Sequence, residues 1–527
     1  MPSNTKYGRA TLISALFVGG GQIYSRRYWA GLVFACLFYG SIGLMLVIWT
    51  GVNEAFWGLI AAWILVWLYN VYDAFKGANY HKPPCEKSCP AGISPWIYIN
   101  LIAADNDEKY PHVPFFGTLE HICPAPCEDE CTRRGIDSAV AIKYLKRCVS
   151  MEEPPTIERK RKEKIAIIGA GPCGLSAAYS LSNKGYDITV YEREEKPGGI
   201  LTTLIPSFRL PDAMLNEEIE NMLRERVELK CGIEVGKDTE FEDILREYDA
   251  VFVAIGAWKA TTLGIPGEEN ALSGFDVLRK IKEGKTFKLG RVGVIGGGNT
   301  AIDVARSLLR QGNEVSIYYR RRIMDMPAEH EDRIEAQEEG IEIVQLTTPL
   351  EIHKDRVTMT KTECLEGRAG AVGLVKGSEY EVEIDALVIT AGQWPESSFL
   401  KDHLKTDKRG RIVTKNGKTS HPKVFAGGDA VLGSATVAHA VGQGLAVADR
   451  IDAHLRKVPG FIYNILRRDF LPAIKLIPMR KAQRIEIPHR KIEERIKDFA
   501  EVELDASNED LRNEACRCLT CPLKFRP

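Results

Sequence analysis

The sequence predicts an α/β fold with two parallel-sheet domains, and three observations lead to that prediction. First, an apolar strand, a glycine-rich turn, a helix and a second apolar strand follow in the same order at 164–192 and at 291–319. Second, five of the 13 cysteines lie within 85–131 and three within 516–521. Third, the N-terminus is strongly apolar, although the formal net charge of all 527 residues is only −1. This length indicates several domains, and the charge does not favour a nucleic-acid-binding protein.

Residues 1–80 predict a transmembrane hairpin. The stretch 28–51 contains no charged residue, and at about 1.5 Å per residue such a helix crosses a hydrocarbon layer of roughly 30 Å. A second apolar stretch, 55–71, is shorter and carries aromatic residues suited to the membrane interface. Basic residues flank the pair on both sides, so the positive-inside rule puts both ends in the cytoplasm. We therefore expect an anchor in the inner (cytoplasmic) membrane, with the soluble domains facing the cytoplasm. Two buried core helices are the alternative.

Residues 81–160 predict a helical domain with a metal centre. The cysteines follow the order Cys85-x3-Cys89-Pro and then Cys123-Pro-x2-Cys127-x3-Cys131. Thiolates at such short spacings, one of them followed by proline, are typical of iron–sulfur clusters. Structural zinc, which more often uses C-x2-C pairs, and cysteines without any ligand role are the alternatives. A disulfide framework is not expected, because a chain of this size does not need one.

Residues 161–289 predict the first part of a dinucleotide-binding domain. Gly169, Gly171 and Gly174 form G-x-G-x-x-G after an apolar strand, and they let backbone N–H groups approach a pyrophosphate at a helix N-terminus. Glu192, at the end of the next strand, is placed to accept hydrogen bonds from a ribose hydroxyl. A glycine-rich turn without a ligand is the alternative. Further candidate cofactor-binding residues in this stretch are Gly199, Arg209 and Gly256.

Residues 290–384 repeat this Rossmann-like unit with one informative difference. The first copy ends its second strand in an acid, whereas the second copy has Tyr319 followed by three arginines at the same spacing. No acid is present to hold a free 2′-hydroxyl, and guanidinium groups suit a 2′-phosphate, so this site is predicted to prefer NADPH over NADH. A solvated basic turn is the alternative. The candidate ligands of this site are Gly296, Gly298, Asn299, Thr300, Arg320 and Arg321.

Residues 385–458 predict the second part of the first dinucleotide-binding domain. One strand ends at Gly392, and the next ends in Gly428 and Asp429 before a helix that starts in a glycine-rich turn. The carboxylate would lie near a ribityl hydroxyl, and the positive end of the helix would face the edge of a flavin ring. Residues 459–527 form a C-terminal tail whose basic portion is expected to be a solvated face. The tail ends in the motif Cys516-Arg-Cys518-Leu-Thr-Cys521.

Together these motifs resemble the small (beta) subunit of glutamate synthase and its relatives. That family includes the electron-input half of dihydropyrimidine dehydrogenase and NADPH-dependent ferredoxin oxidoreductases. The resemblance runs from about residue 81 to the end and rests on both glycine fingerprints, the cysteine groups, Met326-Pro-Ala and Ala426-Gly-Gly-Asp429. It implies FAD in the first Rossmann-like domain, NADPH in the second with NADH as another candidate donor, and two 4Fe-4S clusters in the helical domain.

One departure from the family leads to a hypothesis about the cluster ligands. The family has a C-x2-C pair before the position of Cys85 that is missing here, yet the tail provides the same spacing. We therefore expect the tail to fold back, within the chain or across a dimer. The first cluster would then be held by Cys85, Cys131, Cys518 and Cys521. Cys516 is an alternative ligand from the tail, and the C-x2-C spacing favours Cys518 and Cys521 over it. The second would be held by Cys89, Cys123, Cys127 and a fourth ligand, for which Cys148 is one candidate.

The resemblance, taken together with the apolar N-terminus, leads us to expect a membrane-anchored NAD(P)H:acceptor oxidoreductase, which passes electrons from NADPH through FAD and the clusters to a partner protein or a membrane-bound redox complex. The alternative is an electron-input subunit of a larger complex, without turnover of its own. No catalytic side chain is expected, because the cofactors carry the chemistry. A homodimer and a hetero-oligomer are both compatible with the sequence, and no nucleic-acid partner is expected.

Overall fold

The computed structural model describes residues 64–65, 67–69, 82–105, 108–153, 161–223, 227–365, 370–458 and 482–521. The predicted span 28–51 lies outside these residues, and only five residues of the second apolar stretch are among them. Within the described ranges, no helix is long and apolar enough to cross a membrane.

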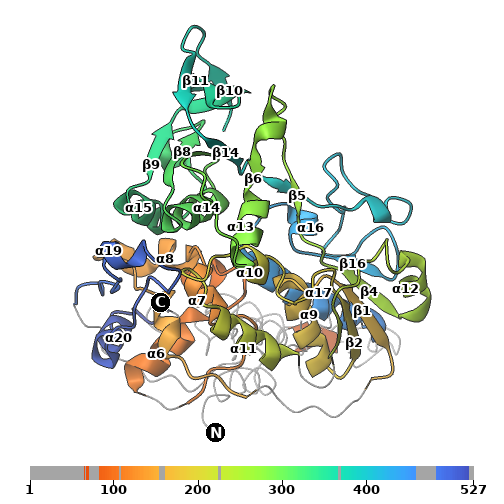
Figure 1. Cartoon of the computed structure of the whole chain (residues 1–527). Coiled ribbons are helices and arrows are strands. Elements are labelled where there is room, and N and C mark those ends of the chain that lie inside the picture. The colour runs from red at the N-terminus through yellow and green to blue at the C-terminus, as the bar shows by residue number, and fades with distance from the viewer. Residues whose placement is uncertain are drawn as a thin grey trace, which may run out of the picture.

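The first parallel sheet has five strands in the order β16-β4-β1-β2-β3. Its strands are β1 (Lys164–Ile168), β2 (Asp187–Tyr191), β3 (Val227–Lys230), β4 (Ala250–Val253) and β16 (Val424–Ala426). The central strand β1 pairs in parallel with β2 and β4, so that Ile168 stands opposite Tyr191 and Val253. β4 and the last four residues of β1 are apolar and buried, as expected for a sheet that is covered on both faces. Helices α9 (Pro172–Asn183) and α17 (Val437–Leu455) pack against each other beside it (Figure 1).

The second parallel sheet has the order β6-β14-β7-β8-β9. Its strands are β6 (Leu272–Ser273), β7 (Arg291–Ile295), β8 (Glu314–Tyr319), β9 (Glu342–Gln345) and β14 (Ala386–Ile389). Its helices are α13 (Gly274–Lys282), α14 (Asn299–Arg310) and α15 (His330–Glu338). The pairing of β14 with β7 and β6 differs from the expected division of the chain. Residues 272–289 and the strand after 385 belong to this second domain, not to the first.

The two domains are joined by a two-stranded ribbon in which β5 (Lys259–Ala260) pairs with β15 (Gln393–Trp394). A smaller antiparallel sheet extends from the second domain at the top of Figure 1. Its strands are β10 (Thr347–Ile352), β11 (Arg356–Cys364), β12 (Val372–Leu374) and β13 (Tyr380–Glu383). The remaining short helices of the first domain are α10 (Ile200–Thr203), α11 (Asp212–Met222), α12 (Phe241–Glu247) and α16 (Asp429–Leu432).

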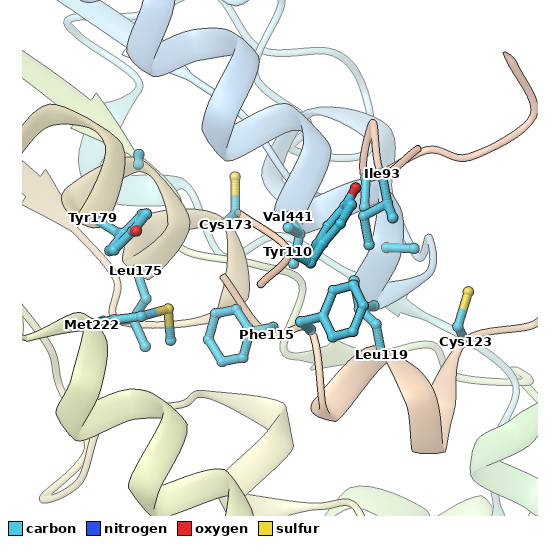
Figure 2. Close-up of a cluster of buried hydrophobic side chains, with 14 of the residues drawn as sticks. Ile93, Tyr110, Phe115, Leu119, Cys123, Cys173, Leu175, Tyr179, Met222 and Val441 are labelled. Carbon is cyan, nitrogen blue, oxygen red and sulfur yellow. The ribbon is translucent and has the colours of Figure 1, made fainter. Parts of the chain in front are cut away.

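The cysteine-bearing domain is helical and packs closely against the first domain. Its helices are α5 (Pro84–Lys87), α6 (Pro95–Ala104), α7 (Thr118–Ile122) and α8 (Pro126–Asp129), followed by 3-10 turns at Thr132–Gly135 and Tyr144–Cys148. The Glu218 carboxylate of α11 accepts the N–H groups of Gly117 and Thr118 at 2.7 and 2.9 Å. Figure 2 shows part of the shared core, in which Tyr110 of this domain lies beside Val441 of α17.

Residues 482–521, here called the C-terminal strap, contact all three domains. The strap contains α19 (Ile492–Arg495) and α20 (Asn508–Ala515). On the second domain, Arg495 Nε lies 3.1 Å from Glu339 Oε1. On the first domain, the N–H of Val502 donates to the carbonyl of Phe208 at 3.2 Å. Near its end the strap enters the cysteine-bearing domain, where its residue Arg517 is fully buried.

The strap also makes a pH-sensitive contact with the second domain. His489 Nε2 lies 3.1 Å from Glu335 Oε1, and this hydrogen bond raises the pKa of His489 above its ordinary value. The pairing therefore stabilises the fold fully below about pH 6.5, and the contribution is lost as the pH rises through the raised pKa. We expect the difference in Tm between the wild type and His489→Gln to shrink between about pH 6 and about pH 9. A constant difference across that range would show that the pair contributes nothing.

Candidate flavin, nucleotide and cysteine sites

A deep cavity opens at the carboxyl ends of β1, β2, β4 and β16, where a doubly wound sheet binds its ligand. Seven residues singled out from the sequence line this cavity: Gly169, Gly171, Glu192, Gly199, Gly256, Gly428 and Asp429. They come from four separate stretches of the first domain, and the parallel strands bring them to one edge. Gly174 does not line the cavity but is needed for its shape.

The glycines of the first fingerprint are required by close backbone contacts. Gly169 has φ +105°, and a Cβ there would lie 2.4 Å from the carbonyl oxygen of Ala254. A Cβ on Gly174 would lie 1.9 Å from the carbonyl oxygen of Gly169. Any side chain at either position would push the turn away from the N-terminus of α9. The turn therefore keeps the helix N–H groups open to a phosphate.

Glu192 is buried at the end of β2 and holds the fingerprint turn. Its carboxylate accepts the N–H of Ala170 at 2.6 Å and the N–H of Glu194 at 3.0 Å. Burial raises the pKa of Glu192, and these two hydrogen bonds oppose that rise. A carboxylate oxygen accepts more than one hydrogen bond, so Glu192 keeps capacity for a ribose hydroxyl.

Asp429 lies at the other end of the cavity, next to the start of α17. Burial raises the pKa of its carboxyl to about 7, and the N–H of Ala435 donates to it at 3.2 Å. The first turn of α17 is capped by Thr436, whose hydroxyl accepts the N–H of His439. The largely buried Asp429 carboxyl, which accepts one hydrogen bond from the described residues, and a helix N-terminus therefore face the same cavity, as a ribityl chain and a flavin ring require.

Sequence reasoning missed the aromatic wall of this cavity. The Trp258 ring lies close to two guanidinium groups, 4.7 Å from that of Arg193 and 5.6 Å from that of Arg279. Glu194 lies within 3.3 Å of both arginines. The signal for it in the sequence is the position of Trp258, two residues after Gly256 and shortly after the end of β4.

The second glycine fingerprint has the same kind of turn as the first, but the strand that follows it ends at Tyr319, followed by arginines, where the first copy has an acid. The Tyr319 ring packs on Gly297, where a Cβ would lie 2.4 Å from the ring. Arg322 is engaged by Asp325 at 2.9 Å. Arg320 is exposed, Arg321 lies 5.4 Å from the Tyr319 ring, and no ion pair between described residues uses either. Two cations are therefore available where a 2′-phosphate would lie.

Three predicted ligands lie elsewhere or are already engaged. Arg209 is buried outside the flavin cavity, with both terminal nitrogens on carboxylates of the second domain, so it is not placed to bind the cofactor there. Asn299 exchanges hydrogen bonds with Glu329. Gly392 has φ +109° and accepts the N–H of Thr261 in the connecting ribbon. Thr300 and the glycines Gly296 and Gly298 lie at or before the start of α14.

The cysteines at the two ends of the chain meet around one small apolar pocket. Cys85, Cys131, Cys518 and Cys521 line it together with Trp96. Burial raises the pKa of the Cys85 thiol, and the three other cysteines raise it further because adjacent thiolates repel one another. The thiolate form of Cys85 is therefore disfavoured at this position unless positive charge compensates it, as the iron atoms of a bound cluster would.

A second group consists of Cys89, Cys123 and Cys127. Burial raises the pKa of the Cys127 thiol, with smaller contributions from Cys123 and Cys89, whereas Lys146 opposes the rise. Cys148 does not face this group. Its thiol donates to the carbonyl of Leu145 at 3.4 Å, and its charged neighbours are Glu120 and Asp505. The structure therefore does not support Cys148 as the fourth ligand.

Among the residues that the structure describes, no three His, Cys, Asp or Glu side chains converge closely enough to hold a single metal ion. A four-iron cluster spreads its ligands around a cube instead of a point, and cysteines grouped around a pocket are compatible with that arrangement.

Two parallel sheets with two glycine fingerprints and a cavity at the strand ends define a two-dinucleotide oxidoreductase. Residues 163–444 match the family described as pyridine nucleotide-disulphide oxidoreductase. FprA of Mycobacterium tuberculosis, solved in complex with NADPH, has the same fold, with a TM-score of 0.50 and 19% identity over 56% of this chain and 85% of that one.

Curated relatives narrow this class. The chain is 33% identical to the beta subunit of NADP(+)-dependent formate dehydrogenase of Moorella thermoacetica, over 83% of this chain and 70% of that protein. It is 32% identical to the glutamate synthase [NADPH] small chain of Escherichia coli, over 70% and 88%. The chain thus belongs to the glutamate synthase small-chain-like branch of the pyridine nucleotide-disulphide oxidoreductases. It is an NAD(P)H-dependent oxidoreductase, and FAD and NADPH are its expected cofactors.

Asp429 provides a test of the flavin cavity. Its folded pKa of about 7 lies above the ordinary 3.8, so its ionisation costs the empty protein up to about 4 kcal/mol above pH 7 and nothing below about pH 4. We expect Asp429→Asn to leave the apoprotein at least as stable as the wild type at pH 8 while FAD affinity falls. Thermal unfolding and FAD retention measure the two effects. Unchanged FAD retention would remove Asp429 from the site.

Proposed function

We propose that the protein is a membrane-anchored NAD(P)H:acceptor oxidoreductase that carries two 4Fe-4S clusters besides FAD. When bound, the flavin exchanges two electrons with nicotinamide and single electrons with iron–sulfur clusters. The chain positions these cofactors and shields them from water. The single observation that carries the proposal is the meeting of Cys518 and Cys521 with Cys85 and Cys131 around one pocket.

The cysteine-bearing domain lies directly against α17, the helix whose N-terminal turn lines the flavin cavity. A Cβ on Gly442 of α17 would lie 1.8 Å from the carbonyl oxygen of Pro90, the residue after Cys89. The N-terminal turn of the same helix lines the flavin cavity through Thr436 and Val437. Cys89 and its group are therefore the cysteines best placed to take electrons from a flavin, and the group that includes the tail cysteines would pass them on.

Buried cations also fix the position of the tail. Arg133 and Arg517 are fully buried, and Arg133 Nη1 donates to the carbonyl of Arg517 at 2.9 Å. Both guanidinium groups are paired with carboxylates, Arg133 with Asp137 and Arg517 with Asp137 and Glu514. Because Arg517 directly precedes Cys518, this buried network holds the tail cysteines beside Cys85 and Cys131.

The apolar stretches 28–51 and 55–71 support an anchor in the inner membrane, with the acceptor a membrane-bound redox complex or a partner protein. The alternative is an electron-input subunit without turnover of its own, and two relatives are named as beta subunits. Anaerobic reduction of a viologen dye by NADPH distinguishes them. Turnover by the purified chain supports the enzyme, whereas inactivity until a partner co-purifies supports the subunit.

The cluster assignment predicts the effect of removing the tail thiols. In Cys518→Ser, Cys521→Ser, we expect iron content to fall to about half of the wild-type value, because one of two clusters loses two ligands. The matched control is Cys516→Ser, since Cys516 is buried in the same tail but its sulfur lies 4.0 Å from the carbonyl of Ala103. Full iron content and two cluster EPR signals in the double variant would contradict the assignment.

The arginines after β8 predict the choice of nucleotide. We expect Arg320→Ala, Arg321→Ala to raise KM for NADPH by about 10- to 100-fold, as the loss of charge-assisted hydrogen bonds implies, and to leave KM for NADH unchanged. Arg322→Ala is the control, because Arg322 is already paired with Asp325. Steady-state kinetics with both nucleotides measure the effect, and an equal loss with NADH would assign these arginines a structural role.

A further inference from the structure

We propose that Arg209 is a positioning residue that fixes the nucleotide-binding domain over the flavin cavity through Asp303 and Asp332. The inference rests on the nicotinamide–flavin half of the proposed function and is independent of the iron–sulfur clusters. It starts from one observation. The Arg209 side chain belongs to the first domain and is buried, but its acidic partners among the described residues all lie in the second domain.

The ribbon that joins the two domains is thin, so their relative orientation depends on contacts elsewhere. The ribbon of β5 and β15 has two paired residues in each strand. Two residue pairs do not define the angle between two sheets. Other contacts must do so, and hydride transfer requires the reacting atoms to approach to about 3–3.5 Å.

Arg209 is attached to the flavin side by a short, hydrogen-bonded turn. Its N–H donates to the carbonyl of Pro206 at 3.0 Å, and the N–H of Leu210 donates to the same carbonyl at 3.1 Å. The turn follows α10 after two residues, and Ile200, the first residue of α10, lines the flavin cavity. A displacement of Arg209 would therefore be transmitted to the wall of that cavity.

Its partners are attached to the nucleotide side. Arg209 Nη1 donates to both carboxylate oxygens of Asp303 at 3.0 and 2.9 Å, and Arg209 Nη2 lies 2.9 Å from Asp332 Oδ2. Asp303 stands on α14, one turn after Asn299 at the start of that helix. Asp332 stands on the first turn of α15. One guanidinium group therefore holds both helices beside the second fingerprint.

Glu329 extends this cluster to the fingerprint turn itself. Asn299 Nδ2 donates to Glu329 Oε1 at 3.1 Å, and the N–H of Glu329 donates back to Asn299 Oδ1 at 2.9 Å. Glu329 Oε1 also lies 3.7 Å from Arg209 Nη2. The N–H of Ala328 donates to the carbonyl of Gly297 at 3.0 Å. The turn that would hold the nucleotide phosphates is thus connected to Arg209 through Glu329, which is hydrogen-bonded to Asn299 and lies beside the Arg209 guanidinium group.

Because the cluster is buried, its charges are satisfied only when the two domains keep Arg209 and Asp303 together. The side chains of Arg209 and Asp303 are 8% and 7% exposed, so either charge without the other would be costly. Three carboxyls face one guanidinium group, and burial raises the pKa of Asp303 to about 6 and of Glu329 to about 7. A change in the orientation of the domains would separate Arg209 from Asp303 and leave both charges buried without their partners.

The experiment measures the anaerobic reduction of bound FAD by NADPH, by stopped-flow absorbance, in Arg209→Met and in the conservative Arg209→Lys. We expect the reduction rate of Arg209→Met to fall by about 10- to 100-fold, as a misplacement of about 1 Å implies. FAD content and the Kd for NADP+ should stay within about twofold of the wild type, and Arg209→Lys should recover part of the rate. Arg291→Met is the control, because Arg291 pairs with Asp385 inside the second domain.

Three results would overturn the inference. An unchanged reduction rate would leave Arg209 with a structural role alone. A parallel loss of FAD or of NADP+ affinity would make it a cofactor-binding residue. An equal loss in Arg291→Met would show that the effect is not specific. If Arg209→Met does not accumulate as folded protein, Asp332→Asn removes one partner and is measured instead, with the same criteria. Failure of NADPH to reduce the wild-type flavin would reject the proposed function, not the role of Arg209.

Discussion

The fold depends on where one buried cation, Arg517, can be accommodated. Its guanidinium group is fully buried and donates to the Asp137 carboxylate at 2.9 Å, and to the carbonyls of Ser138 and Ala139 at 2.7 and 3.1 Å. A buried charge is tolerated only when every donor has a partner, and these partners exist at one place in the cysteine-bearing domain. Docking of this residue determines the position of the tail that follows it, and therefore of Cys518 and Cys521.

The rest of the strap follows from that anchor. Glu514 of α20 accepts a hydrogen bond from Arg517 at 2.6 Å and another from the N–H of Ala141 at 2.8 Å. Upstream, Arg495 reaches Glu339 of the nucleotide-binding domain. One segment therefore completes the first cysteine group and supports the second dinucleotide domain. The same principle recurs at Arg209, where a buried guanidinium group also sets how two parts of the chain meet.

Local sequence patterns predicted the parts of the site that are made by local structure. Gly169, Gly174 and Glu192 could be found because the G-x-G-x-x-G turn imposes backbone contacts within one strand–turn–helix unit. The position of β14 could not, since an apolar strand that ends in glycine reads the same in either sheet, and pairing with β7 decides between them. Arg209 was misassigned for a similar reason: its partners lie about 100 residues away, on α14 and α15. Cys148 was close to the other cysteines in sequence, but its 3-10 turn directs the thiol to Leu145.

The central claim is that electrons from NADPH pass through the flavin to cysteine-bound clusters in the same chain. The most direct measurement is an anaerobic titration of the purified, iron-replete protein with NADPH, in which flavin absorbance and cluster EPR are recorded on the same samples. We expect the flavin to be reduced and paramagnetic reduced-cluster signals to appear together with it. Full flavin reduction without any cluster signal would contradict the account.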